Sequence, residues 1–205
     1  MDVPIELWLV NPAASMCEAF RERFAGLPDV VVHQAGYEDL PPHDCFVTAG
    51  NSFGIMTAGI DAVVVHVHGP QLMDAIQARI LRDHLGEQPI GTAFIEPTGT
   101  PGYPYIGHAP TMRVPSGIDG TDRVYAATLA SLVAVHHHNR VHGDIHTVAF
   151  PAMGAGFGGV PEREAARQMA VAYEHFLDPP RRLDWDTVIA RHRAIVYDGD
   201  TRVVH

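Results

Sequence analysis

Residues 147–161, TVAFPAMGAGFGGVP, combine an apolar run, a glycine-rich loop and a proline that opens a helical pattern. The apolar run ends at Pro151, four glycines follow between positions 154 and 159, and an amphipathic segment begins at Pro161. Glycine permits positive φ and lets a ligand approach the main chain. The N-terminus of a helix offers unpaired N–H groups to an anion. The stretch therefore predicts a strand, a loop and a helix that form a phosphate site.

Strand and helix patterns alternate on both sides of this stretch. Apolar runs predict strands at 5–10, 30–33, 45–49, 91–95, 105–108 and 147–150. Helical spacing predicts helices at 15–24, 60–68, 70–85, 122–139 and 162–177. A Pro/Gly-rich loop is expected at 97–104. Such alternation predicts an α/β sheet that is covered on both faces and binds ligands at the carboxyl ends of its strands.

The composition excludes several kinds of chemistry. The formal net charge of −10 argues against general nucleic-acid binding, which depends on neutralising phosphates. All 14 basic side chains are Arg, so no lysine is present for a Schiff base or a P-loop. The two cysteines, Cys17 and Cys45, are too few for a disulfide framework or a zinc site.

We expect a cytoplasmic protein with no membrane segment and no resident metal. No apolar run approaches the roughly 20 residues that cross a bilayer, and the N-terminal residues lack the features of a signal peptide. The densest histidine group is His136, His137, His138, His142 and His146. Three consecutive histidines cannot all face one point on a helix, so a solvated helix end is favoured over a metal site.

The glycine loop formally matches a dinucleotide-binding fingerprint through Gly154, Gly156 and Gly159. That fingerprint belongs to the first β-α-β unit and needs an acidic residue about 20 positions later, at the end of the next strand. Here the pattern comes late, and the nearest acidic candidate, Asp178, precedes two prolines. A second loop, Gly50–Gly59, also follows an apolar strand and precedes a helix. The two loops together could hold a pyrophosphate, or both could be turns without a ligand.

Ordered motifs resemble those of the macrodomain family. They are Asp44–Asn51 (DCFVTAGN), Thr57–Asp61 (TAGID), Gly69-Pro70, Tyr105–His108 (YIGH) and Phe150–Ala152 with the loop 154–161. The resemblance covers roughly residues 30–177. It implies a three-layer α/β/α sandwich with a mixed, mostly parallel central sheet that binds ADP-ribose or an ADP-ribosyl derivative, with no further cofactor.

The resemblance also implies the roles of individual residues. Asn51 would hold the distal ribose, and Asp61 would orient or deprotonate a water molecule. The alternatives are that Asn51 caps its own loop and that Asp61 caps its helix. The residues expected to contact the ligand are Ala49, Gly50, Ser52, Gly59, Ile60, Met153, Gly154, Ala155, Gly156, Phe157 and Gly158.

Some positions depart from the family pattern. Thr48 and Gly50 replace residues typical of its strand-end motif, and Gly158 stands where the family often has an aromatic residue. The acidic residue that reads adenine has no unique counterpart, so Glu38 and Asp39 are both candidates. These departures indicate a divergent branch of the family.

The sequence thus predicts one macrodomain-like domain at residues 1–177 and a C-terminal extension at 178–205 that packs on it. In the extension we expect a helix at 185–192 and a hairpin of 195–197 with 202–204. The expected function is metal-independent hydrolysis of an ADP-ribosyl bond, either de-ADP-ribosylation or O-acyl-ADP-ribose hydrolysis. The alternatives are a reader that binds ADP-ribosylated substrates without turnover, and a structural or assembly module with an inactive pocket.

Overall fold

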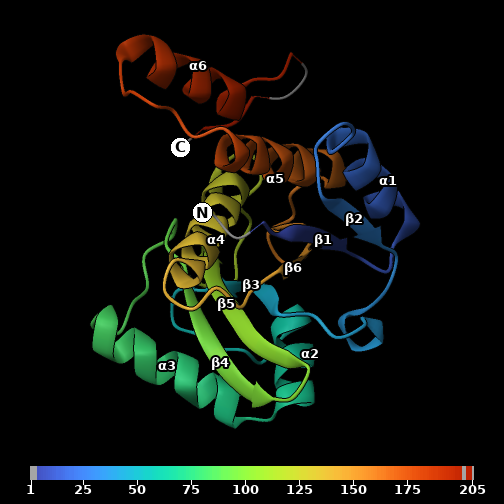
Figure 1. Cartoon of the computed structure of the whole chain (residues 1–205), viewed down its shortest axis with the longest axis vertical. Helices are drawn as coiled ribbons and strands as arrows, with labels where there is room; N and C mark the ends of the chain where they lie inside the picture. The colour runs from blue at the N-terminus through green and yellow to red at the C-terminus, as the bar shows by residue number, and fades with distance from the viewer. Residues whose placement is uncertain (1–3, 200–201, 205) are drawn as a thin grey trace.

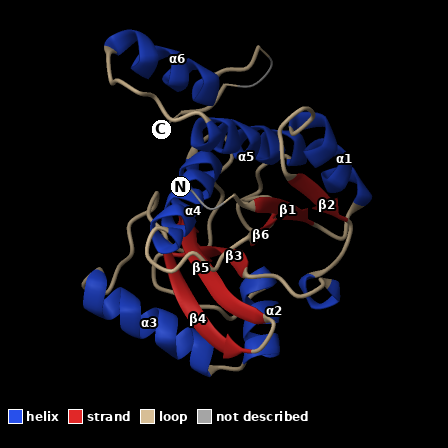
Figure 2. Ribbon diagram, in the orientation of Figure 1, coloured by secondary structure: helices blue, strands red, loops and turns tan. Residues whose placement is uncertain are grey.

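A mixed sheet runs through the centre of the protein (Figures 1 and 2), in a computed structural model that describes residues 4–199 and 202–204. Its strands are β1 (Glu6–Val10), β2 (Val30–His33), β3 (Cys45–Asn51), β4 (Phe94–Thr100), β5 (Tyr103–Met112) and β6 (Thr147–Pro151). Their spatial order is β2-β1-β6-β3-β5-β4. All neighbours pair in parallel except β4, which is antiparallel to β5. The predicted mixed, mostly parallel sheet is confirmed.

Helices cover both faces of this sheet (Figure 1). One layer contains α1 (Ala14–Arg23), α4 (Arg123–Asn139) and α5 (Glu162–Leu177), and the other contains α2 (Gly59–His68) and α3 (Gln71–Asp83). A 3₁₀ turn, η1 (Tyr37–Asp39), follows β2. Across the described residues, no helix has the length and apolar character needed to cross a membrane. The layers form the predicted α/β/α sandwich.

The central strand β3 explains why the sheet needs helices on both sides. Successive strand side chains point to opposite faces. Cys45 and Val47 belong to the core beneath α1, α4 and α5, whereas Phe46 belongs to the core beneath α2 and α3. All three side chains are fully buried. A strand that is buried on both faces has a nearly continuous run of apolar residues in its sequence, and β3 shows this pattern.

The hairpin of β4 and β5 differs from the prediction. The structure continues both strands through most of the stretch 97–104, which we expected to be a loop. Pro97 is compatible with a strand here because β4 is the edge strand and needs no partner on its outer side. The proline and glycine content marks an irregular register between Pro97 and Thr100, not a long loop.

The C-terminal segment forms a helix, α6 (Trp185–Val196), that projects beyond α5 (Figure 1). The expected strand at 195–197 is wrong for Ile195 and Val196, which lie in the last turn of this helix. Of the expected hairpin, the structure has one antiparallel bridge between Tyr197 and Arg202, and residues 200 and 201 lie outside the described residues. Val204 pairs instead with Thr121, just before α4.

Candidate functional site

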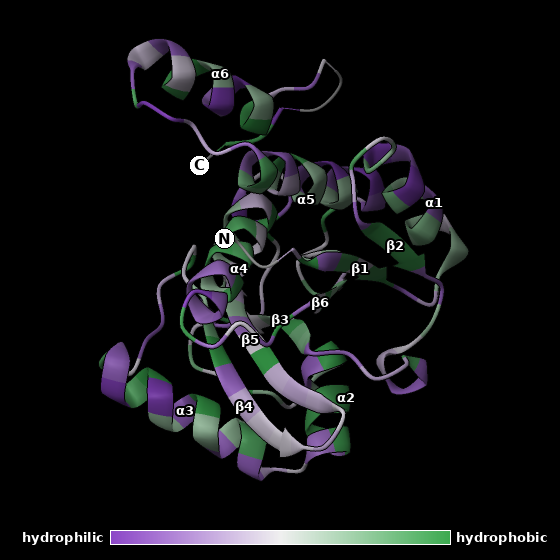
Figure 3. Ribbon diagram, in the orientation of Figure 1, coloured by the Kyte–Doolittle hydropathy of each residue, from purple (hydrophilic) through white to green (hydrophobic). Residues whose placement is uncertain are grey.

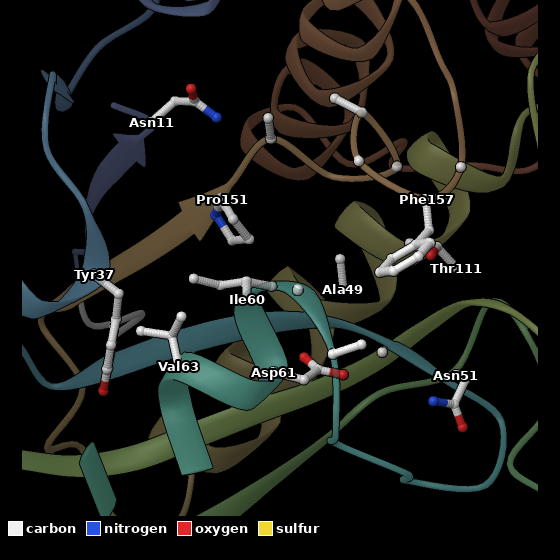
Figure 4. A pocket seen from close by; sticks show the side chains of 18 of the residues that line it. Asn11, Tyr37, Ala49, Asn51, Ile60, Asp61, Val63, Thr111, Pro151 and Phe157 are labelled. Atoms are coloured by element: carbon white, nitrogen blue, oxygen red, sulfur yellow. The ribbon is translucent and has the colours of Figure 1, made fainter. Parts of the chain in front are cut away.

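A cavity of about 590 Å³ opens at the carboxyl ends of the parallel strands (Figure 4). Asn11 follows β1, Asn51 ends β3, Thr111 lies near the end of β5, and Pro151 ends β6; all four residues line the cavity. The two glycine loops and the first turn of α2 complete the wall. The volume is within the range of 300–1,000 Å³ that is typical of small-molecule sites. The location is the one expected for a ligand site in an α/β sheet.

The loop after β6 requires glycine for steric reasons at two positions. Gly154 has φ +73°, and a Cβ there would lie 2.7 Å from Val124 Cγ2. A Cβ on Gly158 would lie 2.3 Å from the carbonyl oxygen of Gly154. An aromatic residue at position 158 is therefore incompatible with this loop, which accounts for that departure from the family pattern.

The same loop has N–H groups that are free to bind an anion. In the described part of the chain, the N–H groups of Gly156, Phe157 and Gly158 donate no hydrogen bond to another backbone group. All three residues line the cavity. Consecutive unpaired N–H groups near a helix N-terminus are typical of phosphate sites. This geometry allows the loop to bind a diphosphate without a cationic side chain.

Gly50 is fixed by a buried histidine beneath the cavity. A Cβ at position 50 would lie 2.6 Å from His108 Nε2. The His108 ring is held because its Nδ1 donates to Gln88 Oε1 (2.7 Å) and its face stacks on Phe94. Burial lowers the pKa of His108 to about 4, so the ring is neutral at physiological pH. The unusual glycine at this strand end thus accommodates the His108 side chain.

The side-chain amide of Asn51 organises its own loop. Its Nδ2 donates to the carbonyl oxygen of Ile55 (2.8 Å), and its Oδ1 accepts from the N–H groups of Phe53 (3.1 Å) and Ile55 (3.3 Å). This arrangement is the loop-capping alternative considered for Asn51. Because Oδ1 already accepts two hydrogen bonds, only one amide N–H remains for a ligand.

Asp61 lies in the first turn of α2 and is only 6% exposed. Its Oδ1 is buried without a hydrogen-bond partner among the described residues. Burial raises the pKa of this carboxyl group from 3.8 to about 7, because desolvation disfavours the charged form. The N-cap of α2 is Ala58, and the helix has no side-chain cap hydrogen bond. Asp61 is therefore a buried, unpaired carboxyl group in the cavity wall (Figure 4).

Phe157 joins the two glycine loops. Its ring packs against Gly59, where a Cβ would lie 3.5 Å from Phe157 Cε2. Gly59 has φ +59° and begins α2, two residues before Asp61. Phe157 is nevertheless 63% exposed, so its outer face is in contact with solvent. The contact places Phe157, in the loop after β6, against the first turn of α2, which carries Asp61.

Most of the predicted site residues line this one cavity. They are Ala49, Gly50, Asn51, Gly59, Ile60, Asp61, Gly154, Ala155, Gly156, Phe157 and Gly158. Ser52 and Met153 do not belong to its described wall, because both side chains are buried in the protein interior and are at most 1% exposed. Their neighbours Asn51 and Gly154 line the cavity, but Ser52 and Met153 lie in turns and direct their own side chains into the interior. The side chains of Ser52 and Met153, which we expected at the ligand, are therefore not part of this cavity wall.

Of the two acidic residues expected at the adenine side, one lines the cavity. Glu38 lines the cavity together with Gly36 and Tyr37, whereas Asp39 is absent from the described wall. The position of this wall is set by η1, whose Tyr37 is buried and shares a hydrogen bond with His68 Nε2 (2.5 Å). Glu38 is thus the acidic side chain at that end of the cavity.

Several lining residues were not identified from the sequence. Asn11 and Pro12 follow the first strand, and Thr111 lies near the end of β5. Thr111 is fully buried, and its Oγ1 has no hydrogen-bond partner among the described residues. The rule that ligands bind at the carboxyl ends of strands could have identified Asn11 and Thr111. No glycine pattern marks either position, which is why the motifs alone missed them.

Comparison with known proteins places this site in a family. Residues 47–169 match the Macro domain model. An uncharacterised protein of Aquifex aeolicus is 30% identical over 134 residues, which are 65% of this chain and 74% of the relative. The macrodomain of Mycobacterium tuberculosis DarG is 25% identical, with a TM-score of 0.53 over 65% of this chain and 83% of that chain.

A variant of the Oceanobacillus iheyensis macrodomain, solved with ADPR, has a similar fold at lower identity. It is 22% identical, with a TM-score of 0.55 over 67% of this chain and 72% of that chain. The stretch that matches the Macro domain model contains both glycine loops and Asp61. The chain therefore belongs to the macrodomain family.

Proposed function

We propose that this protein binds ADP-ribose in the cavity between its two glycine loops. The cavity volume suits a small molecule, and the unpaired N–H groups of Gly156, Phe157 and Gly158 suit its diphosphate. The described lining residues include no Arg, so backbone dipoles would meet the phosphate charge. The O. iheyensis macrodomain with ADPR supports the same ligand. Glu38 would contact the adenine side.

We further propose that the protein hydrolyses an ADP-ribosyl bond. The observation that carries this proposal is Asp61, a buried carboxyl group in the cavity wall whose pKa lies near 7. A general base with a pKa near the working pH is the efficient choice. Asp61 takes a proton from a water molecule as the water oxygen bonds to the anomeric carbon of the distal ribose. The leaving group departs with the bonding electron pair and takes a proton from solvent.

The test is release of free ADP-ribose from a mono-ADP-ribosylated protein, with O-acetyl-ADP-ribose as a second substrate. Asp61→Asn should lower the rate by about 10²- to 10⁴-fold while ADP-ribose binding persists. The wild-type rate should rise as pH increases through about 7, because the carboxylate is the active form. Asp74→Asn is the matched control, since Asp74 lies in the first turn of α3, outside the cavity wall. Wild-type turnover by Asp61→Asn would refute the assignment.

A reader module is the second candidate, and the state of Asn51 favours it. The amide that could orient a reacting ribose is engaged in its own loop by three hydrogen bonds. A reader needs only the loop N–H groups and the cavity shape. Tight ADP-ribose binding by the wild-type protein with no product released from either substrate would select the reader. Binding and turnover together would exclude it.

A further inference from the structure

The helix α6 has an uncovered apolar stripe. None of its residues, all of which the structure describes, is buried. Trp185, Val188 and Ile189 have the spacing i, i+3 and i+4 that places side chains on one face of a helix. Trp185 is 79% exposed, as is Leu183 just before the helix. In Figure 3 this helix carries apolar residues although it projects from the body of the protein.

Polar contacts nevertheless hold α6 in a defined position. The guanidinium group of Arg167 donates to the carbonyl oxygens of Ala194 (3.0 Å) and Ile195 (2.8 Å). Arg167 is buried and also pairs with Glu164 (2.7 Å). Arg191, within α6, donates to the carbonyl oxygen of His175 near the end of α5 (3.3 Å). The helix is thus anchored to α5 while its apolar stripe stays exposed.

A second cavity, of about 500 Å³, lies beside the anchored helix. Its wall includes Val133 of α4, Leu177 at the end of α5 and Arg191 of α6. It also includes Ile5, directly before β1. The second cavity therefore lies at the amino end of β1, whereas the first cavity lies at the carboxyl ends of the strands. We call Val133, Leu177, Leu183, Trp185, Val188 and Ile189 the extension surface. All six are between 39% and 79% exposed.

The charge of the chain is distributed unevenly around this surface. Residues 178–205 contain five Arg and five Asp, whereas residues 1–177 contain nine Arg and 19 acidic residues. The extension is therefore formally neutral, and the rest of the chain carries the whole net charge of −10. The acidic and Arg side chains in the wall of the second cavity are Asp29, Arg140 and Arg191, so the recess is not acidic either, and two copies repel each other least when they meet here. The net charge of −10 of the whole chain disfavours nucleic acid and anionic membranes as occupants of this surface.

We propose that the extension surface is the contact of a two-fold symmetric dimer of this protein. A two-fold contact uses one patch on both copies, so each must present a projection and a recess that fit each other. The stripe on α6 is the projection, and the second cavity is the recess. Trp185 of each copy enters the second cavity of the other. Large aromatic anchors in recesses are typical of the residues that dominate such contacts. The ADP-ribose cavity stays open in the dimer.

Sedimentation equilibrium of the full chain tests the proposal. A dimer with a micromolar dissociation constant is almost fully formed at a protein concentration of about 100 μM. At that concentration the mass of the wild-type protein should be twice the 22.3 kDa of one chain. Trp185→Glu and Ile189→Glu should each give the monomer mass with an unchanged melting temperature. Leu85→Glu is the matched control because Leu85 is 95% exposed and lies outside the extension surface, so this variant should stay dimeric.

Two results would overturn the dimer. The first is a monomeric wild-type protein at that concentration. The second is a dimer that persists in both the Trp185→Glu and Ile189→Glu variants, since its contact would then lie elsewhere. The mutated side chains are exposed, so loss of folding is not expected to obscure the result. Circular dichroism of each variant verifies this. ADP-ribose binding is not used as a readout, which keeps this test independent of the proposed function.

Discussion

The carboxyl group of Asp61 makes the stability of the protein depend on pH. Its pKa is about 7 in the folded state and 3.8 when exposed. Folding therefore favours the protonated form of this carboxyl group. The contribution of Asp61 to the free energy of unfolding is fully present below pH 3.8 and is lost as pH rises through 7. Asparagine does not titrate. Asp61→Asn should raise the free energy of unfolding by about 4 kcal/mol at pH 8, with little difference near pH 3.5.

Urea denaturation of both proteins at the two pH values measures this difference. Asp74→Asn should show no comparable gain, because Asp74 is an exposed side chain. Equal stability of the wild-type protein and Asp61→Asn at pH 8 would mean that Asp61 is not desolvated in the folded state. Its role as a base with a pKa near 7 would then have no basis.

Gly50 should tolerate no side chain. The Cβ of Gly50→Ala would lie 2.6 Å from His108 Nε2, and the ring cannot move without breaking its hydrogen bond to Gln88. Overpacking of this kind costs about 1–3 kcal/mol of unfolding free energy. Gly117→Ala is the control, since a Cβ at Gly117 has no neighbour within 4 Å. Thermal unfolding of both variants is the measurement, and a Gly50→Ala protein as stable as Gly117→Ala would contradict the close packing of Gly50 on His108.

Single residues also show the limits of prediction from sequence. The motifs identified Asn51 and Asp61 because they stand at fixed places in glycine loops. They could not say that Asn51 would use its amide within its own loop, because that depends on the path of residues 53–55. Nor could they show that Ser52 and Met153 face the interior, because facing depends on the local backbone direction.

At the scale of elements, the loop after β6 offers a matched pair of substitutions. A Cβ on Gly158 meets the carbonyl oxygen of Gly154 at 2.3 Å, whereas a Cβ on Gly156 has no neighbour within 4 Å. Gly158→Ala should therefore distort the loop and weaken ADP-ribose binding by at least about tenfold, or 1.4 kcal/mol. Gly156→Ala should bind within about twofold of the wild-type protein. Calorimetric titration compares them, and equal affinities would show that the loop path does not control binding.

Elements with strong periodicity were the most predictable part of the fold. The helix at 162–177 was predicted with the bounds that α5 has, and the apolar run of β3 was also recognised. The hairpin of β4 and β5 was not, because Pro97 and Gly99 predict a loop unless the strand is known to lie at an edge. Edge position is a property of the whole sheet. The end of α6 was missed because Ile195 and Val196 suit a strand as well as a helix.

At the scale of the whole molecule, Arg167 links the extension to the domain. Its guanidinium group is buried, pairs with Glu164 and donates to two carbonyl oxygens at the end of α6. Arg167→Ala leaves the buried carboxylate of Glu164 without its cationic partner, with Gln168 Nε2 still donating to it (2.8 Å), and this loss costs about 3–5 kcal/mol. It should also increase hydrogen exchange throughout 185–196. Arg163→Ala removes an exposed pair with Glu22 and should cost less than about 1 kcal/mol.

Hydrogen exchange read by mass spectrometry, together with urea denaturation, checks both parts of this prediction. If α6 exchanges equally in the wild-type protein and Arg167→Ala, its position does not depend on this contact. The extension surface would then need another anchor. Arg163→Ala should leave both the exchange of 185–196 and the unfolding midpoint close to their wild-type values, because its pair with Glu22 lies in solvent.

Calorimetric titration of the full chain with ADP-ribose, comparing Gly156→Glu with Gly117→Glu, tests most directly whether the glycine-loop cavity binds ADP-ribose. Both glycines have open space for a Cβ, and neither has a positive φ, so neither substitution strains the fold. Gly156 lines the cavity and Gly117 is not among its described lining residues. We predict wild-type affinity for Gly117→Glu and no measurable binding for Gly156→Glu, whose carboxylate fills the loop and repels the diphosphate. Equal binding by the two variants would contradict the claim that the glycine-loop cavity is the ADP-ribose site.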